Sequence, residues 1–355
     1  MEKEELTKET MAFPLLEWFD ENKRVLPWRE DPKPYRVWIS EIMLQQTRVE
    51  TVKSYFERFM NHFPTILDLA EAEEDELLKA WEGLGYYSRA KNLQKAAKIL
   101  VEQYDAKLPM EQEELLKIPG IGPYTSGAIS SIAYGRKAAA VDGNVLRVFM
   151  RLLADDSDIL KESVKKKTAE RVLALMPEER AGDFNQALME LGAMVCLPHG
   201  APKCKECPLM ERCAARKQGR EEEFPKKSKN KLRKRVKRTI LILSYQNQIV
   251  LQKRPDTGLL SGLYEFPGLE GIYTKEDIGI YLEQMGVRAE KIKKIERARH
   301  IFSHVEWYMQ GYYVEISKLT ENKVHENMPW IFVERKTARE QYPIPSAFLA
   351  YKKYL

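Results

Sequence analysis

Apolar side chains recur at helical spacing up to about Ala215. Segments rich in Leu, Ala, Glu and Lys alternate there with Gly and Pro, which is typical of helices joined by turns. One stripe advances by four and three residues alternately, the period of a helix face: Trp38, Ile42, Gln45, Val49, Val52, Phe56 and Phe59. The stripe predicts one helix or two consecutive helices, and the whole region is predicted to be all-α.

The pattern changes after Arg238, where short runs of β-branched and aromatic residues replace the helical spacing. Such runs, separated by polar pairs or glycine, predict strands and hairpins. The predicted elements are a hairpin of strands 239–245 and 248–254, a strand pair at 304–316 turning at Gly311, and helices at 275–285 and 346–354. The C-terminal part is therefore predicted to be a smaller α+β domain.

The two regions are separated by a basic run, and 355 residues suit a multidomain protein. Lys226–Arg238 reads KKSKNKLRKRVKR, with nine basic residues and no acid. Like charges at this density favour an extended, solvated segment that is also attracted to phosphates. We predict a helical region at 1–220, an interdomain linker at 221–238 and the α+β domain at 239–355.

Charge and hydropathy add two weaker expectations. The net charge of +5 is by itself little indication of a nucleic-acid partner. No apolar run approaches the length of about 20 residues that spans a bilayer, and the N-terminal MEKEELTKET lacks the apolar core of a secretory signal. We expect a cytoplasmic protein with no membrane partner.

The cysteines Cys196, Cys204, Cys207 and Cys213 are the only four in the chain. They lie within eighteen residues, and two disulfides are not expected in an intracellular protein. Four neighbouring thiolates suit zinc or an iron–sulfur cluster. A single C-x2-C pair flanked by two separate cysteines favours the cluster, because zinc sites more often combine two such pairs, but the spacing leaves zinc open.

A Gly- and Pro-rich turn, LKIPGIGPYT at Leu116–Thr125, interrupts the helical pattern. Gly120 and Gly122 let the backbone approach a ligand, and amides at the start of the next helix can donate to a DNA phosphate. The two glycines alone are equally typical of an ordinary helix–helix turn. The full string resembles the helix-hairpin-helix of base-excision DNA glycosylases, which is more specific.

Two carboxylates could carry the chemistry of glycosidic cleavage. Asp142 precedes Gly143 and a new apolar stripe, so it is predicted at a helix N-cap, where amides and the helix dipole would keep it ionised. Glu41 has apolar neighbours on both sides. A glutamate in a helix usually faces solvent, but a pocket would raise its pKa and make it an acid. One raised and one lowered carboxylate would form a glycosidase pair.

Over nearly its whole length the chain resembles the MutY family of adenine DNA glycosylases. The strings that carry the resemblance are LPWR (26–29), SEIMLQQTRVETV (40–52), WEGLGYYSRA (81–90), IPGIGPYT (118–125), AVDGNVLRV (140–148) and ALMELGAMVC (187–196). The family implies removal of adenine opposite 8-oxoguanine or guanine by base flipping. It also implies a six-helix module at 28–134 containing the hairpin and a cluster module formed by 1–27 with 135–220.

The resemblance implies roles for four residues of the site. Glu41 would protonate adenine N7 and help to activate water, and Asp142 would stabilise the sugar cation or form a transient adduct. Asn144 would position the centre and Tyr124 would line it. Bifunctional relatives such as endonuclease III have a lysine nucleophile where this chain has Tyr124, so a monofunctional enzyme that leaves an abasic site is expected.

The resemblance also implies a cofactor and DNA contacts. The four cysteines would hold one four-iron four-sulfur cluster, although the family's first cysteine gap has six residues and this chain has seven, 197–203. Duplex DNA would be bound by a monomer, with residues inserted beside the lesion, in contact with 8-oxoguanine or on the phosphates. Gln46 and Tyr86 would enter the duplex beside the lesion, and Thr47 and Leu84 would contact 8-oxoguanine. Gly120 and Gly122 would approach a phosphate. Ser303 and His304 would take part in recognition of 8-oxoguanine.

The C-terminal domain carries two motifs of its own. Leu263–Gly268, LYEFPG, resembles the start of a Nudix box, but the following Gly279–Gln284 keeps at most one of the acids that would bind Mg²⁺. The fold without the hydrolase is therefore expected. Phe302-Ser303-His304 resembles the MutY family's 8-oxoguanine recognition loop.

Three other functions compete with this interpretation. A thymine or oxidised-pyrimidine glycosylase on the same scaffold is disfavoured by Tyr124 and the Nudix-like domain. A nucleotide pyrophosphatase is disfavoured by the missing acids, and a lesion-binding protein without catalysis by the presence of both Glu41 and Asp142. The choice between direct attack by water and a covalent Asp142 intermediate stays open.

Overall fold

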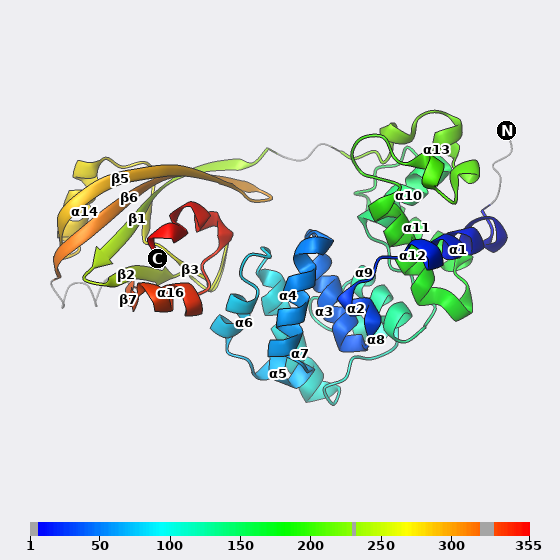
Figure 1. Ribbon diagram of the computed structural model, residues 1–355, viewed down its shortest axis with the longest axis horizontal. Coiled ribbons are helices and arrows are strands. Elements are labelled where there is room, and N and C mark those ends of the chain that lie inside the picture. The colour runs from blue at the N-terminus through cyan, green and yellow to red at the C-terminus, as the bar shows by residue number, and fades with distance from the viewer. Residues whose placement is uncertain (1–5, 229–231, 320–329) are drawn as a thin grey trace. The chain divides into compact units, whose positions relative to one another are not determined.

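The computed structural model describes residues 6–228, 232–319 and 330–355, which belong to two compact units (Figure 1). The first unit consists of Met1–Glu71 and Asn92–Lys229, and the second of Ala72–Lys91 and Asn230–Leu355. The described part of the first unit is built from helices, and the second is dominated by a mixed β-sheet. Within the described residues, no helix is both long and apolar enough to cross a membrane.

Short helices separated by turns form the first unit, as the spacing of apolar residues predicts. They are η1 (Lys8–Ala12), α1 (Phe13–Asn22), α2 (Pro27–Glu30), α3 (Pro34–Leu44), α4 (Val49–His62), α5 (Ile66–Glu71), α7 (Ser88–Gln103), α8 (Gln112–Leu115), α9 (Pro123–Ala128), η2 (Ile129–Ala133), α10 (Gly143–Leu153), α11 (Glu162–Leu175), η3 (Glu178–Arg180), α12 (Ala181–Met194), η4 (Cys204–Glu206), η5 (Met210–Arg212), α13 (Ala214–Lys217) and η6 (Glu221–Glu223). Helix α7 begins in the part of the chain that groups with the second unit.

The N-terminal helices pack beside α10 and α12, far along the chain (Figure 1). Leu15 and Phe19 of α1 share a buried core with Phe149 of α10 and Phe184 of α12. The cysteine loop closes this core, since the cysteines, except Cys204, pack against it. The segments predicted as a cluster module thus share one core.

The long apolar stripe forms two helices because the chain turns sharply between α3 and α4. Gln46 lies in this turn with a φ of 57°, a left-handed conformation that an α-helix of L-residues cannot continue. Val52, Phe56 and Phe59 are buried in α4, and Trp38 and Ile42 are buried in α3.

The described part of the second unit has seven strands in a single sheet. Its elements are α6 (Glu74–Ala80), β1 (Lys234–Tyr245), β2 (Gln248–Lys253), β3 (Tyr264–Glu265), β4 (Gly268–Glu270), α14 (Lys275–Gln284), β5 (Val287–Ile301), β6 (Val305–Leu319), β7 (Trp330–Glu334), α16 (Arg335–Gln341) and η7 (Ser346–Tyr354). The main strand order is β3-β2-β1-β6-β5, with β4 paired to β1 and β7 paired to β2. The predicted first hairpin and the α14 helix are confirmed, whereas the last predicted helix is a 3-10 helix.

Alternating residues of β1 supply two cores, one on each face of the sheet. Ile240 and Ile242 pack with Phe348 and Tyr351 of η7. Leu241 and Leu243 pack instead with residues of α14, as period-two alternation requires. Strands β1 and β6 run parallel over their paired length, and β5 pairs antiparallel with β6 (Figure 1).

The prediction of a strand turn at Gly311 is wrong. Gly311 lies inside β6 and pairs with Ile240 of β1. A Cβ there would stand 2.6 Å from Tyr351 Cε1 and 2.7 Å from Ile295 Cγ1. Gly311 is needed for close packing against η7 and β5, and not for a turn.

The basic run extends further into the sheet than its charge suggests. Strand β1 begins at Lys234, inside the segment predicted as a linker, and Lys234–Arg238 pair with β6 from Val305 onward. Lys234, Arg235 and Lys237 stay exposed, so main-chain pairing can proceed while these three charges remain in water. Lys229–Lys231, in the middle of the run, lie outside the described residues.

Candidate active site

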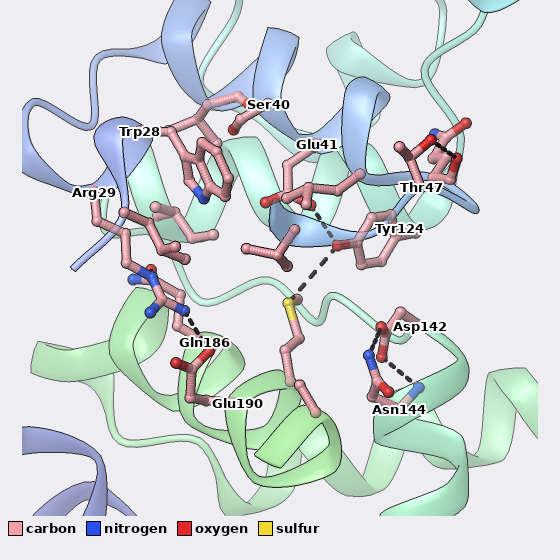
Figure 2. Close-up of a pocket in the computed structure, with 18 of the residues that line it drawn as sticks. Trp28, Arg29, Ser40, Glu41, Thr47, Tyr124, Asp142, Asn144, Gln186 and Glu190 are labelled. Atoms are coloured by element: carbon pink, nitrogen blue, oxygen red, sulfur yellow. Dashed lines mark hydrogen bonds and ion pairs between the residues drawn. The ribbon is translucent and has the colours of Figure 1, made fainter. Parts of the chain in front are cut away.

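Glu41 faces a cavity of about 540 Å³ in the first unit, which confirms the pocket-facing alternative (Figure 2). Its helix α3 starts on Pro34 and is buried from Val37 to Met43. Glu41 is only 5% exposed, and this burial raises its pKa to about 7. The hydrogen bond from Tyr124 and the charge of Arg29 oppose the shift, and Asp142 reinforces it. Glu41 is thus an acid whose ionisation falls near neutrality.

Tyr124 connects the hairpin to Glu41. It is the second residue of α9, and its hydroxyl donates to Glu41 Oε2 (Figure 2). Met189 Sδ lies 3.7 Å from the same hydroxyl. Burial, together with the neighbouring carboxylates, raises the pKa of Tyr124 well above its usual range, so the phenol stays protonated and serves as a donor.

Asp142 is the N-cap of α10, as the sequence predicts. Its Oδ1 accepts hydrogen bonds of 2.8 Å from the amides of Asn144 and Val145, and Oδ2 accepts one of 2.7 Å from Asn144 Nδ2. The predicted lowering of its pKa is wrong in direction. Burial raises the pKa of Asp142 and outweighs the hydrogen bonds and Arg147, which lower it. Both carboxylates of the pair are therefore shifted upward.

The side chain of Asn144 is held in place by Arg147. Its Oδ1 accepts a 2.9 Å hydrogen bond from Arg147 Nη2, and the same nitrogen donates to the carbonyl of Gly192 at 2.7 Å. Arg147 Nε donates to the carbonyl of Cys196 at 2.8 Å. The amide that orients Asp142 is thereby fixed to the end of α12.

Gly192→Ala is expected to lower turnover about tenfold or more without removing any polar group of the site. A Cβ on Gly192 would lie 2.5 Å from Asn144 Cβ. Relief of such overlap typically costs about 1–3 kcal/mol. If about 1.4 kcal/mol of this cost adds to the activation barrier, the reaction slows tenfold. Single-turnover kinetics test this, with Gly279→Ala as control, where the new Cβ meets only Ile292 Cδ1 at 3.9 Å. Full activity of Gly192→Ala would contradict the proposed positioning of Asn144.

A buried ion-pair network closes the other end of the cavity. Glu190 Oε1 accepts from Arg24 Nε at 2.7 Å, and Glu190 Oε2 accepts from Arg29 Nη2 at 3.0 Å (Figure 2). Although burial raises the pKa of Glu190, these arginines lower it to about 2. Arg29 Nε also donates to Gln186 Oε1 at 2.9 Å.

Sequence reasoning did not single out Arg24, Gln186 or Glu190. The available signal was the isolated Glu190 inside the apolar string ALMELGAMV, together with arginines near Trp28. A charge in such surroundings is rarely buried without a partner. Pairing the charges across 166 positions needed the fold.

The predicted DNA contacts fall into four places, the last of which is the hairpin turn. Gln46 and Thr47 line the mouth of the Glu41 cavity. In the second unit, Tyr86, Ser303 and His304 line another cavity of about 460 Å³. The structure places Leu84 apart from both groups, as a buried residue.

The hairpin turn lies apart from the cavity lining and presents both glycines to solvent. Gly120 has a φ of 82° and approaches Asn92, whose Cβ would be 3.0 Å from an added Cβ. Gly122 is the N-cap of α9 and has open space around it. The two exposed glycines leave room for a ligand to approach the backbone of the turn.

The four cysteines form no disulfide with one another and line one small cavity. Arg151 Nη1 lies 3.2 Å from Cys196 Sγ. Burial raises the pKa of Cys207 to about 12. Among the described residues, no group of three or more His, Cys, Asp or Glu is placed to hold a metal ion.

The extra residue in the first cysteine gap is accommodated by a loop. Lys203 N donates to the carbonyl of Val195 at 2.9 Å, which returns the chain to the end of α12. Gly200 has a φ of 71° within the loop. Cys204 is still brought to the same cavity as Cys196.

The Nudix-like helix is α14, and its acid Asp277 serves local structure. Thr274 and Asp277 form a capping box, in which Asp277 Oδ2 accepts from Thr274 N at 2.9 Å. Residues 279–284 contain one acid, Glu283. The helix keeps the fold but lacks the ligands that a hydrolase would need.

Comparisons with protein families match the helical part and the C-terminal α+β part to two different families. Residues 39–173 match the model of the HhH-GPD superfamily of base excision DNA repair proteins, and residues 238–353 match that of the NUDIX domain. Among solved structures, a thermostable thymine-DNA glycosylase has a TM-score of 0.53 and 28% identity, covering 59% of this chain and 97% of its own. An endonuclease III–DNA complex has a TM-score of 0.51 and 26% identity, covering 61% and 99%. The chain is a base-excision-repair glycosylase of the helix-hairpin-helix class, and DNA is its partner.

Curated relatives define the family more narrowly. The adenine DNA glycosylase of Buchnera aphidicola subsp. Schizaphis graminum is 37% identical over 292 residues, 82% of this chain and 83% of the relative. The human adenine DNA glycosylase is 35% identical over 358 residues, 84% of this chain and 65% of the relative. This chain belongs to the adenine DNA glycosylase family.

Proposed function

We propose that this chain hydrolyses the N-glycosidic bond of adenine mispaired with 8-oxoguanine or guanine in duplex DNA. The observation that carries the proposal is the meeting of Glu41, Tyr124 and Asp142 at one cavity, where burial raises the pKa of Glu41 to about 7. A base rotated out of the duplex could enter this cavity. The reaction takes place on chromosomal DNA, in the cytoplasm of a bacterial cell, and a monomer suffices for it.

Glu41 and Asp142 divide the reaction between the base and the sugar. Protonated Glu41 donates to adenine N7, which makes the base a neutral leaving group. The positive charge that develops on the sugar is stabilised by the Asp142 carboxylate, which Asn144 orients. Glu41, then ionised, accepts a proton from water, or Asp142 first forms a sugar adduct that water releases.

Tyr124 holds Glu41 without competing as a nucleophile. The phenol donates a hydrogen bond to Glu41 and is kept neutral by burial. Among the described residues that line the cavity there is no lysine. A Schiff base, and with it strand cleavage, is therefore not expected.

Contacts with the base opposite adenine and entry into the duplex beside the lesion are assigned to two sets of residues. Ser303 and His304 are exposed at a loop tip of the second unit and hydrogen-bond each other at 3.2 Å. Gln46 and Tyr86 have φ angles of 57° and 48°. Strained conformations of this kind concentrate at functional sites, which supports a role for both residues in the opened duplex.

The family implies a four-iron four-sulfur cluster, and the residues present fit it. Cys196, Cys204, Cys207 and Cys213 line one cavity, and four thiolates around a shared space are the ligand set that a four-iron four-sulfur cluster takes. When bound, the cluster would fix the loop after α12 and take no part in hydrolysis. Arg147 and Arg151 supply positive charge beside it.

Purified protein is expected to be brown, with iron and acid-labile sulfide in roughly equal amounts. Replacing Cys207 by serine should remove the colour and destabilise the loop. Visible absorption, iron and sulfide analysis and zinc analysis measure this. Colourless protein with stoichiometric zinc would refute the cluster.

The substrate is tested with duplexes carrying A opposite 8-oxoguanine, A opposite G, and T opposite G. Adenine release from the first two is expected, with strand breaks only after alkali and little trapping by borohydride. The third duplex separates this proposal from a thymine glycosylase. Release of thymine, or efficient borohydride trapping, would overturn it.

A further inference from the structure

The proposed recognition loop, Phe302–His304, is a three-residue turn between β5 and β6. Phe302 N donates to the carbonyl of Val305 at 2.8 Å, and Lys234 N donates to the carbonyl of His304 at 3.0 Å. Arg233 Nε donates to the carbonyl of Phe302 at 3.1 Å. The main chain is thus tied at its base while Ser303 and His304 remain exposed.

One side chain of the loop points back into the domain. The ring of Phe302 packs edge-on against His300 at 4.5 Å and against Trp307 at 4.9 Å between centroids. Trp307 is 4% exposed and also contacts Phe348 of η7, at 6.0 Å. The position of Phe302 therefore depends on a tryptophan fixed in the core.

Two arginines lie over the ring of the same tryptophan. The guanidinium carbon of Arg238 lies 4.3 Å from the Trp307 ring centroid and that of Arg254 lies 5.7 Å away. Cations over an indole face are attracted to it. Burying two guanidinium groups there requires a counter-charge.

That counter-charge comes from the LYEFPG motif. Glu265, only 3% exposed, accepts from Arg238 Nη1 at 3.1 Å and from Arg254 Nη1 at 2.7 Å. Gln252 Nε2 donates to its other oxygen at 3.0 Å. The next motif residue, Phe266, packs against Phe348, the aromatic neighbour of Trp307.

We propose that Trp307, clamped by Arg238 and Arg254 on Glu265, is the positioning residue of the recognition loop and sets the preference for 8-oxoguanine over guanine. The inference rests on the proposed function, in which the loop reads that base. The Nudix-like motif, without its metal-binding acids, would thus serve as a brace for base recognition. We call Glu265, Arg238, Arg254 and Trp307 the tryptophan clamp.

Trp307→Leu is expected to lower the preference for A opposite 8-oxoguanine over A opposite G by about fivefold, the loss typical of one aromatic pair. The readout is the ratio of single-turnover rates and of duplex affinities for the two substrates, measured on the full chain. A purely structural role would lower the amount of folded protein and leave this ratio unchanged.

Trp330→Leu is the matched control. Trp330 is 8% exposed in the same domain, and it packs in the core on the other face of the sheet. Its replacement removes a comparable indole and should leave the ratio unchanged. Equal ratios in Trp307→Leu and Trp330→Leu would overturn the proposal.

Two further variants keep the test decisive. Phe302→Leu removes the other partner of the aromatic pair, at a half-buried position, and should reproduce the loss even if Trp307→Leu does not fold; an unchanged ratio in Phe302→Leu overturns the proposal. Ser303→Ala tests the proposed function itself. A lowered ratio in Ser303→Ala with a normal ratio in Trp307→Leu refutes the clamp alone, whereas normal ratios in both also refute base reading by Ser303.

The double variant Trp307→Leu, Ser303→Ala separates positioning from an independent effect. If Trp307 acts through the loop, the double variant should lose little more than the worse single variant, because coupled residues are not additive. Fully additive losses would mean that Trp307 acts elsewhere, and would overturn the proposal.

Discussion

Asp142→Asn is expected to lower the single-turnover rate of adenine release by about a thousandfold or more. The replacement keeps the size of the side chain and an oxygen that can accept from the amides of Asn144 and Val145, so the cap of α10 survives. It removes the negative charge that faces the developing sugar cation in a buried site, where such charges act most strongly. Adenine-release kinetics measure the loss.

Binding and folding should be nearly unaffected by the same change. Affinity for a duplex with A opposite 8-oxoguanine is expected to stay within about tenfold, a change of about 1.4 kcal/mol. Asp277→Asn is the matched control, since Asp277 also lies in the first turn of a helix and takes part in its cap. Turnover of Asp142→Asn close to that of Asp277→Asn would refute the assigned role of Asp142.

The position of Asp142 could be predicted because the signal is local. An aspartate before glycine and an apolar stripe specify an N-cap within a few residues. The direction of its pKa shift could not be predicted this way. Burial against α12 and the cavity wall outweighs the cap hydrogen bonds, and burial depends on segments remote in sequence.

Gly311 also shows that local sequence patterns do not report tertiary packing. A glycine between two β-rich runs indicates a turn by local rules. The structure uses it inside β6 because Tyr351 and Ile295 occupy the space of a side chain. Neither residue is near Gly311 in the sequence, so only the tertiary packing shows why glycine stands there.

Glu41 lies between these cases. Its apolar neighbours indicated either a solvent-facing residue or a pocket, and local spacing could not choose between them. The tertiary fold decides for the pocket, because α9 brings the Tyr124 hydroxyl to the carboxyl group of Glu41. The family resemblance implied the pocket, whereas the physical cause of the raised pKa, the burial of Glu41 in α3, appears only in the fold.

Adenine release is expected to fall as pH rises above about 7, because burial raises the pKa of Glu41 from 4.5 to about 7. Below that value Glu41 carries the proton that adenine N7 receives, and above it the protonated fraction falls about tenfold per pH unit. Glu41→Gln cannot transfer a proton, so the rate should fall by at least about a hundredfold and the alkaline limb of the profile should disappear. Both effects are measured by single-turnover rates from about pH 5 to about pH 9, a range that brackets the raised pKa of Glu41.

Tyr124→Phe identifies the group that titrates. The hydrogen bond from Tyr124 lowers the pKa of Glu41, so its removal should move the alkaline limb to higher pH while the limb persists. A structural disturbance would lower the rate at every pH without moving the limb. If the limb stayed in place in Tyr124→Phe and survived in Glu41→Gln, the titrating acid would be another group, and the assignment of Glu41 as the proton donor would fail.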